Sequence, residues 1–258
     1  MPMPLPAPSS HQPPLVVTRG DRRSLEFAPG DMQSEMSLSR PTALVLEYTR
    51  AMMGFVLFVP RPRHIVMVGL GGGSLAKFCY RVFPDARITV IEVRADVIDL
   101  RTQFCVPPDD ARFRVIHADA IDYLAAAPAT ADVLVLDGFD THGLPPALGS
   151  ASFYATCRRA LVDGGVLVTN IFNYDPHWQA MLGRLDAAFD GHICWFDDIA
   201  GNNHVVYALH APSPHARNRQ QRIRRRHGRG NGLLHRTLAR LLVAWLSLRR
   251  MATTPQPS

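Results

Sequence analysis

The pattern of apolar and polar positions becomes regular at His64. From there, apolar runs of strand length alternate with segments whose apolar residues recur at helical spacing. We expect strands at 64–68, 87–92, 113–117, 132–137 and 166–172, with helices at 74–83, 95–104, 120–126 and 153–161. Strands that alternate with helices of this length form right-handed βαβ units. The pattern therefore predicts a parallel sheet with helices on both faces.

The end of this pattern narrows the fold class. A helix is expected at 176–189, followed by two strand-like runs, 192–196 and 204–210, which the turn-rich sequence DDIAGNN connects. A late antiparallel hairpin is typical of class I methyltransferase-like domains, and simple dinucleotide-binding domains lack it. We predict an α/β, Rossmann-like, doubly wound sheet with a C-terminal antiparallel hairpin. This fold favours an adenosyl sulfonium ligand over NAD.

The segments before the sheet follow different patterns. Residues 1–14 contain six prolines without the charged-then-apolar order of a signal peptide, so we expect a disordered leader. Residues 15–60 predict a small N-terminal β-hairpin unit with turns at Gly20 and Pro29–Gly30, and a connecting helix over 42–58. We assign residues 61–212 to the methyltransferase-like nucleotide-binding domain.

Positive charge is concentrated in a tail at residues 213–258. Eleven of the 28 Lys and Arg residues lie between Arg217 and Arg250, and no acid follows Asp198. The remainder is mildly acidic, with 17 basic against 22 acidic residues. An amphipathic helix is expected over 233–250, too short and too charged to span a bilayer. Contact with an anionic membrane or nucleic acid, a partner helix and a dispensable extension all remain open for this tail.

The overall composition and the spacing of the Cys and His residues argue against a disulfide-stabilised or metal-binding protein. The 47% hydrophobic and 19% charged residues are typical of a soluble globular protein with one main domain. Four separated cysteines without CxxC spacing predict buried free thiols in a cytoplasmic protein: Cys79, Cys105, Cys157 and Cys194. The eleven histidines show no metal-ligand spacing, so we expect no metal.

The first strand of the sheet runs into a glycine-rich turn, HIVMVGLGGGS, at residues 64–74. Glycine permits a positive φ and a close approach of the backbone to a ligand, and the following helix presents unpaired N–H groups. Gly69, Gly71 and Gly73 are therefore candidate cofactor-binding residues. Since tight strand-to-helix turns also use glycine without a ligand, the turn alone does not decide the function.

Four acids follow the strands at the sheet edge where open α/β sheets bind ligands. Glu92 ends the second strand about twenty residues after the glycines, where a carboxylate accepts both ribose hydroxyls. Asp119 follows the third strand and is suited to the adenine amino group or to a helix cap. Asp137 and Asp140 follow the fourth strand, and His142 is an alternative base. As a set, these acids favour a ligand site over independent caps.

These pieces resemble the polyamine aminopropyltransferase, or spermidine synthase, family from about residue 25 to residue 210. The matching segments are LEFAPGDMQS, PRPRHIVMVGLGGGS, VIEV, HADAIDYL, DVLVLDGFD and SFYATCRRALVDGGVLVTNIF. The resemblance implies transfer of the aminopropyl group of decarboxylated S-adenosylmethionine, a co-substrate, to a small polyamine substrate such as putrescine. It implies no prosthetic group. Members often form homodimers, although no pattern in this sequence marks an interface.

The resemblance also implies roles for residues of the co-substrate half. Glu92 resembles the ribose-binding acid of the family, and Asp119 with Ala120 resembles the pair that contacts adenine. Asp137 resembles the catalytic aspartate, which would hold the attacking amine and accept its proton. Such a carboxylate is needed because an amine with a pKa of about 10 is mostly protonated at neutral pH.

In the amine half, Asp140 resembles the second acid of the catalytic loop. Gln33 resembles the glutamine that lines the polyamine pocket, and Tyr48 lies near the aromatic–glutamine pair of the family. Three positions depart from the family pattern: Gly72 replaces an aspartate, Thr141 a proline and Asn170 a glutamine.

Two other functions remain open. The missing acid at Gly72 removes repulsion against the carboxylate of intact S-adenosylmethionine, which favours an S-adenosylmethionine-dependent methyltransferase. The third hypothesis is a non-catalytic nucleotide-binding protein that docks through its arginine-rich tail. Ligand binding without residues 213–258 would distinguish an enzyme from such a docking protein.

Overall fold

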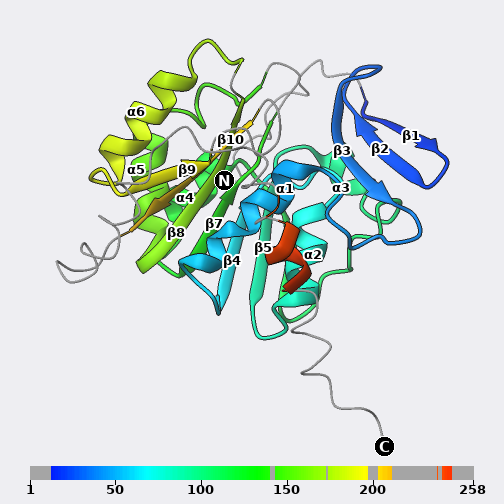
Figure 1. Ribbon diagram of the computed structural model, residues 1–258, viewed down its shortest axis with the longest axis horizontal. Coiled ribbons are helices and arrows are strands. Elements are labelled where there is room, and N and C mark those ends of the chain that lie inside the picture. The colour runs from blue at the N-terminus through cyan, green and yellow to red at the C-terminus, as the bar shows by residue number, and fades with distance from the viewer. Residues whose placement is uncertain are drawn as a thin grey trace, which may run out of the picture.

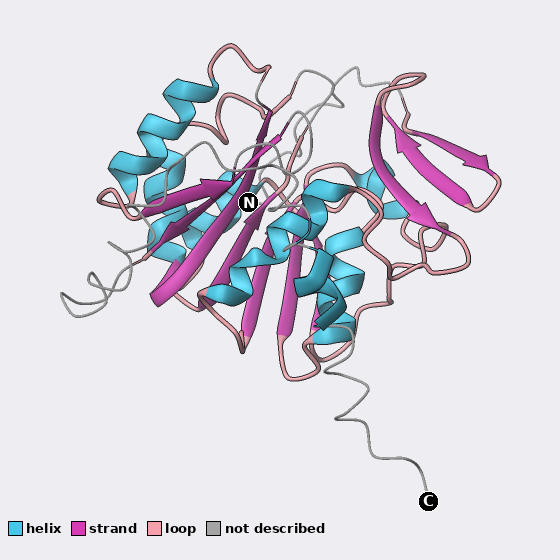
Figure 2. Cartoon of the chain, viewed as in Figure 1, coloured by secondary structure: helices cyan, strands magenta, loops and turns pink. Residues whose placement is uncertain are grey.

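The computed structural model describes residues 13–139, 143–172, 174–196, 203–210, 237 and 240–245. The described N-terminal part forms a three-stranded antiparallel sheet in the order β1-β2-β3, which lies to one side of a larger sheet (Figures 1 and 2). Its strands are β1 (Leu15–Arg19), β2 (Arg22–Glu26) and β3 (Met32–Ser37). The predicted hairpin unit therefore contains a third strand.

The larger sheet has seven strands in the order β6-β5-β4-β7-β8-β10-β9. They are β4 (His64–Val68), β5 (Arg87–Glu92), β6 (Phe113–His117), β7 (Ala131–Leu136), β8 (Leu161–Phe172), β9 (Ile193–Phe196) and β10 (Asn203–Leu209). Strands β4 to β8 pair in parallel, whereas β10 is antiparallel to both β8 and β9. This confirms the doubly wound sheet with a C-terminal antiparallel hairpin. Strand order reverses at β4, where such sheets bind their ligands.

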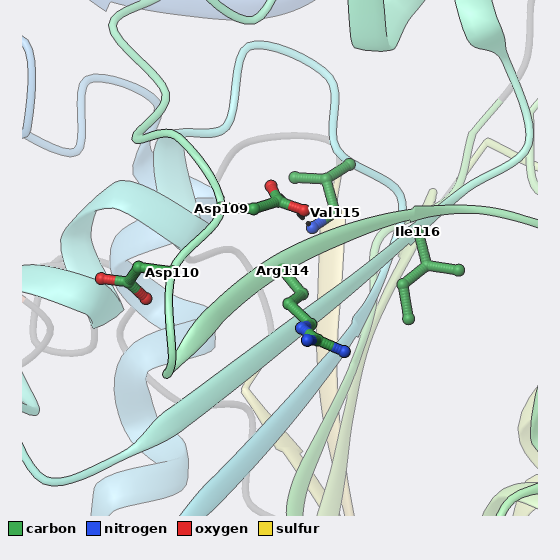
Figure 3. A pocket seen from close by; sticks show the side chains of 5 residues that line it. All are labelled: Asp109, Asp110, Arg114, Val115 and Ile116. Atoms are coloured by element: carbon green, nitrogen blue, oxygen red, sulfur yellow. Dashed lines mark hydrogen bonds between the residues drawn. The ribbon is translucent and has the colours of Figure 1, made fainter.

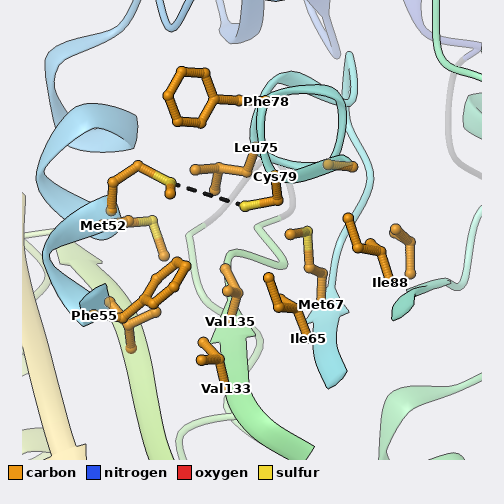
Figure 4. Packing of buried hydrophobic residues seen from close by; sticks show 14 of the residues in the cluster. Met52, Phe55, Ile65, Met67, Leu75, Phe78, Cys79, Ile88, Val133 and Val135 are labelled. Atoms are coloured by element: carbon orange, nitrogen blue, oxygen red, sulfur yellow. Dashed lines mark hydrogen bonds between the residues drawn. The ribbon is translucent and has the colours of Figure 1, made fainter. Parts of the chain in front are cut away.

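Helices cover both faces of this sheet, as predicted. They are α1 (Glu47–Met52), the 3₁₀ helix η1 (Met53–Leu57), α2 (Ser74–Val82), α3 (Ala95–Asp99), α4 (Ala120–Ala126), α5 (Ala151–Ala160) and α6 (Trp178–Ala188). Helices α1 to α3 and η1 pack on one face, and α4 to α6 pack on the other. Figure 4 shows the first face, where Met52, Phe55 and Phe78 meet Ile65, Ile88 and Val133. Because both faces are covered, all five residues of β4 are buried.

Two predicted helices are shorter in the structure. The helix expected over 42–58 begins at Glu47, because Leu46 is extended, and it continues as η1. The helix expected over 95–104 ends at Asp99, and Cys105 follows with a positive φ of 55°. Cys105 is also exposed, so the prediction of a buried thiol is wrong there. Apolar spacing does not reveal that the helix ends before Phe104, which is buried in the core of this face from a loop.

The small sheet packs against helix α2 through β3. Lys77, the only lysine in the sequence, is 2% exposed on α2. Its Nζ donates to Phe104 O at 2.6 Å and contacts Met36 Sδ at 3.1 Å. Burial lowers the pKa of Lys77 to about 8. This contact brings β3 to the start of α2, beside the glycine-rich turn. The domain boundary at residues 60 and 61 stays a prediction.

Candidate active site

Asp137 directly follows β7, at the carboxyl end of the sheet and beside the reversal of strand order. Its N–H donates to Val68 O at 3.0 Å, which joins the ends of β7 and β4. Tyr48 Oη donates to Asp137 Oδ2 at 3.2 Å, and Asn170 Nδ2 makes a longer contact of 3.5 Å with Oδ1. The structure therefore brings together residues from α1, β7 and β8 around one carboxylate.

The surroundings of Asp137 suit proton transfer near neutral pH. Burial raises the pKa of Asp137 to about 6, although the hydrogen bonds from Tyr48 and Asn170 act in the opposite direction. A carboxylate that titrates close to the working pH is an effective general base. Burial, and then the charge of Asp137, raise the pKa of Tyr48 well above its ordinary value. The Tyr48 hydroxyl therefore remains a donor.

Asn170 carries an acceptor without a donor in the described part of the chain. Its side chain is 1% exposed, and Oδ1 has no hydrogen-bond partner among the described residues. A buried acceptor without a donor is costly, typically by about 1–3 kcal/mol. Asp137 and Asn170 therefore present a carboxylate and an amide oxygen side by side, which suits a ligand with several N–H groups.

The glycine turn packs directly against this site. Gly69, Gly71 and Gly73 have positive φ angles of 94°, 50° and 65°. A Cβ at Gly69 would overlap the Asp137 carbonyl oxygen, whereas one at Gly71 would meet Ser34 Cβ only at 3.6 Å. The turn needs glycine for its backbone and lies directly beside Asp137. Cofactor binding by these three residues stays a prediction.

Gly72 lies where the small sheet and the loop after α3 close over the turn. A Cβ there would lie 2.7 Å from Ser34 Oγ and 2.9 Å from Phe104 Cδ1. These two side chains occupy the space that an acid at position 72 would need. Sequence reasoning missed Ser34 and Phe104, and the buried alternation of Ser34 with Met36 along β3 was the available signal.

Glu92 ends β5 and is 8% exposed. Its Oε2 accepts from Leu70 N at 2.8 Å, and its Oε1 accepts from Arg94 N at 2.9 Å. Glu92 thereby fixes the glycine turn to the neighbouring strand. Each carboxylate oxygen retains a second lone pair, so the geometry fits the predicted acceptance of ribose hydroxyls.

Asp119 is the N-cap of α4, and its Oδ1 accepts from Ile121 N at 2.7 Å. The helix-cap interpretation of this residue is confirmed. Its side chain is exposed, and Ala120 is buried behind it. A contact of the pair with adenine, through the other carboxylate oxygen, stays a prediction.

One further described candidate, Gln33, is not joined to Asp137. Gln33 is half-buried on β3, and no hydrogen bond in the described part of the chain joins it to Asp137 or Tyr48. Asp140, Thr141 and His142 lie outside the described residues. The predicted second acid and the alternative base of the loop therefore have no structural placement here.

A row of aromatic rings extends from Phe139, two residues after Asp137, to the surface. The ring centroids of Phe139 and Phe172 are 4.4 Å apart, and Tyr174 stacks on Phe172 at 4.9 Å and 13°. Tyr174 is 65% exposed. Burial raises the pKa of Tyr174, and the charges of Asp31 and Asp175 raise it further. Sequence reasoning missed this row, which ends in an aromatic face beside two acids.

A separate pocket lies on the outer edge of the sheet at β6 (Figure 3). Its lining residues are Asp109, Asp110, Arg114, Val115 and Ile116. Strands β5 and β4 separate it from β7, and its acids are engaged by Arg101 at 2.8 Å and Tyr80 at 2.6 Å. This pocket is therefore distinct from the candidate site at Asp137.

Two further findings concern only the described part of the chain. None of its helices has the length and apolar character that crossing a bilayer requires. No group of three or more His, Cys, Asp or Glu residues there is arranged to hold a metal ion.

The strand order and the C-terminal antiparallel hairpin define the class: an α/β protein with a methyltransferase-like fold, which carries a buried aspartate at the carboxyl end of β7. The family model of the spermine/spermidine synthase domain matches residues 45–179, which include this aspartate. The chain belongs to the spermine/spermidine synthase family. Membership makes it a transferase, so the non-catalytic hypothesis is not supported.

Individual relatives agree with this assignment. The polyamine aminopropyltransferase of Neisseria meningitidis serogroup A is 35% identical over 215 residues, covering 83% of this chain and 81% of the relative. The structure of a probable spermidine synthase from Corynebacterium glutamicum has a TM-score of 0.68 at 22% identity, covering 88% and 90% of the two chains. Human methyltransferase-like protein 13, in complex with SAH, has a TM-score of 0.55 at 22% identity, covering 82% and 93%. The two structures share the fold.

Proposed function

We propose that this protein is a cytoplasmic aminopropyltransferase of polyamine biosynthesis. It transfers the aminopropyl group of decarboxylated S-adenosylmethionine to a diamine such as putrescine. The observation that carries the proposal is Asp137, a buried carboxylate whose pKa is raised to about 6. It lies next to Asn170, whose Oδ1 has no hydrogen-bond partner among the described residues. The family membership of the chain supports the same activity.

The chain acts mainly on the attacking amine. Asp137 accepts a proton from the amine, while the second N–H of the amine donates to Asn170 Oδ1. Tyr48 donates to Asp137 Oδ2, and this hydrogen bond fixes the orientation of the carboxylate. The amine nitrogen then bonds to the carbon next to the sulfonium, and the carbon–sulfur bond breaks with its electron pair on sulfur. The co-substrate supplies that electrophilic carbon and a neutral thioether leaving group.

The residues around the glycine turn fit the adenosyl part of the co-substrate. The turn presents backbone beside Asp137, and Glu92 lies at the end of the neighbouring strand with free lone pairs. In the proposal, Gly69, Gly71 and Gly73 line the co-substrate and Glu92 accepts its ribose hydroxyls. Asp119 and Ala120 contact its adenine. Gln33 and Asp140 complete the amine pocket.

The aromatic row supports a diamine as the acceptor. An ammonium group is attracted to the face of an aromatic ring, and more strongly where carboxylates lie close. Tyr174 presents such a face at the end of the row, with Asp31 and Asp175 nearby. In the proposal, the amine at Asp137 reacts while the second ammonium of the same molecule lies over this ring.

The test is calorimetric binding combined with turnover of the purified protein. We expect tighter binding of decarboxylated than of intact S-adenosylmethionine, with consumption of putrescine. Asp137→Asn is expected to bind the co-substrate and to lose turnover by about 10²–10⁴-fold, the usual contribution of a general base. Asp85→Asn is the matched control, because Asp85 is exposed in the turn before β5, at the opposite end of the sheet. Turnover within tenfold of the unmodified protein in Asp137→Asn contradicts the mechanism.

One observation favours a second candidate, a methyltransferase that uses intact S-adenosylmethionine. Position 72 carries no acid, and Ser34 and Phe104 close the space where one would stand. No carboxylate from this position repels the carboxylate of the intact cofactor. Tighter binding of intact S-adenosylmethionine in the same calorimetric experiment would establish this candidate instead.

A further inference from the structure

Part of the arginine-rich tail contacts α1, the helix that carries Tyr48. Residues 240–245 are helical and lie beside α1 and α2, where they form the red helix in Figure 1. Arg240 Nη2 donates to Glu47 Oε1 at 2.6 Å across 193 positions of sequence. Leu242 and Val243 are half-buried and pack against the hydrophobic core of this face. The tail therefore contributes a contact to α1, which the sequence did not indicate.

The helix that receives this contact carries Tyr48 in its first turn. Helix α1 has six residues, and its N-cap residue Leu46 makes no side-chain capping hydrogen bond. A helix of this length is unstable without tertiary contacts. Its C-terminal half is attached to the sheet, because Tyr207 Oη donates to Ala51 O at 2.5 Å.

Several hydrogen bonds of the first turn are local. Arg50 donates to Leu44 O at 2.8 Å and to Val45 O at 2.6 Å, and Thr49 Oγ1 donates to Leu46 O at 2.6 Å. These bonds hold residues 44–50 together. The first turn is attached to other elements by the hydrogen bond of Tyr48 to Asp137 and, one residue away, by that of Glu47 to Arg240.

We propose that Arg240 is a positioning residue for the reaction. The helix at 240–245 holds the first turn of α1 in place, and so keeps the Tyr48 hydroxyl on Asp137 Oδ2. This inference rests on the proposed function, which gives Asp137 the role of proton acceptor. It assigns a role in positioning Tyr48 to a tail segment that lies outside the part of the chain matched by the family model.

A displacement of Tyr48 is detectable as a change in the pKa of Asp137. The groups that shift the pKa of Asp137 besides burial are Tyr48 from α1 and Asn170 from β8. The charged side chains of α1, Glu47 and Arg50, are not among them. Because the Tyr48 hydrogen bond lowers this pKa, a displaced Tyr48 raises it, and the acidic limb of the rate profile moves to higher pH.

The experiment uses the full chain with ¹³C-labelled aspartate. The Asp137 carboxyl resonance, assigned by its loss in Asp137→Asn, is titrated by NMR, and kcat/KM for putrescine is measured against pH. Tyr48→Phe defines the full upward shift. We expect Arg240→Ala to shift the titration in the same direction and to lower kcat/KM at pH 6 by about two- to fivefold, as for an exposed ion pair. Leu242→Ala is expected to act in the same way.

Arg158→Ala is the matched control, because Arg158 Nη2 pairs with Asp190 Oδ2 at the same 2.6 Å on α5, across the sheet from α1. The charge swap Glu47→Arg with Arg240→Glu is expected to restore the titration. An unshifted titration in Arg240→Ala, an equal shift in Arg158→Ala, or a swap that restores nothing would overturn the inference. Since NMR reads the carboxyl group without turnover, an inactive protein with the expected shifts would reject the proposed function and leave the positioning role intact.

Discussion

At the scale of single residues, the burial of Asp137 suits its proposed role as a general base but lowers the stability of the folded protein. Burial raises its pKa to about 6, above the value of about 3.9 expected for aspartate in an unfolded chain. The folded protein therefore holds the ionised carboxylate less favourably than the unfolded chain does. The difference vanishes below both pKa values, grows as the pH rises from about 4 to 6, and is complete above 6.

Asp137→Asn is accordingly expected to stabilise the protein at the pH where it abolishes turnover. The neutral amide avoids the burial of a charge, and two pKa units correspond to about 3 kcal/mol at most. Urea unfolding at pH 8 and at pH 4.5 measures the effect, with Asp85→Asn as the surface control. The expected gain is large at pH 8 and small at pH 4.5. An equal free energy of unfolding for variant and unmodified protein at pH 8 contradicts the assigned burial cost.

At the scale of elements, the packing of α1 and η1 against the sheet depends on one close contact, between Gly54 and Tyr207. A Cβ at Gly54 in η1 would overlap Tyr207 Oη. Tyr207 is fully buried on β10, and its hydroxyl is bonded to Ala51 O in the preceding helix. Gly54 therefore allows the segment that carries Tyr48 to lie against β10.

Gly54→Ala is expected to lower stability by about 1–3 kcal/mol, because the added methyl displaces a buried ring in a packed core. Gly183→Ala is the matched control: Gly183 lies in α6, and its added Cβ would meet nothing within 4 Å. There the same change is expected to stabilise by about 0.5–1 kcal/mol, since alanine favours helix. Thermal unfolding of both variants measures the loss of stability in Gly54→Ala and the gain in Gly183→Ala. An unchanged stability of Gly54→Ala would refute the close contact.

At the scale of the whole molecule, the small sheet packs against the glycine turn and α2, which follow the first strand of the large sheet. Ser34 from the small sheet and Phe104 from the loop after α3 both face Gly72. Lys77 joins the same two parts by its bonds to Met36 and Phe104. The small sheet thus forms one wall of the candidate site.

This arrangement predicts energetic coupling between the small sheet and the glycine turn. Gly72→Ala is expected to destabilise the protein by about 1–3 kcal/mol, because its Cβ meets Ser34 Oγ and Phe104. Adding Ser34→Gly removes one of the two clashes, so the double variant is expected to recover about 0.5 kcal/mol or more relative to additivity. Denaturant unfolding of the four proteins in the cycle measures this coupling. Strict additivity would show that the small sheet does not contact the glycine turn there.

The sequence alone was sufficient for the main sheet, the glycine turn and the acids at its edge. Apolar runs at strand length and apolar spacing of the helices depend on near neighbours, so β4 to β7, β9 and β10 were predicted to within one residue at each end. Strand β8 begins at Leu161, five residues before its predicted start. The resemblance to the spermidine synthases placed Tyr48 near the site, and the structure joins it to Asp137. Local patterns failed where the chain leaves regular spacing, as at Cys105 and at the start of α1.

Only the tertiary structure decided how distant side chains meet. The contact of Tyr48 with Asp137 spans 89 positions, and that of Arg240 with Glu47 spans 193. The unpaired oxygen of Asn170 and the closed space at Gly72 likewise depend on neighbours from other elements. Sequence periodicity reports which face of an element is buried. Which side chains share a buried space is set by the packing of elements against one another, and that information appears only when the chain is folded.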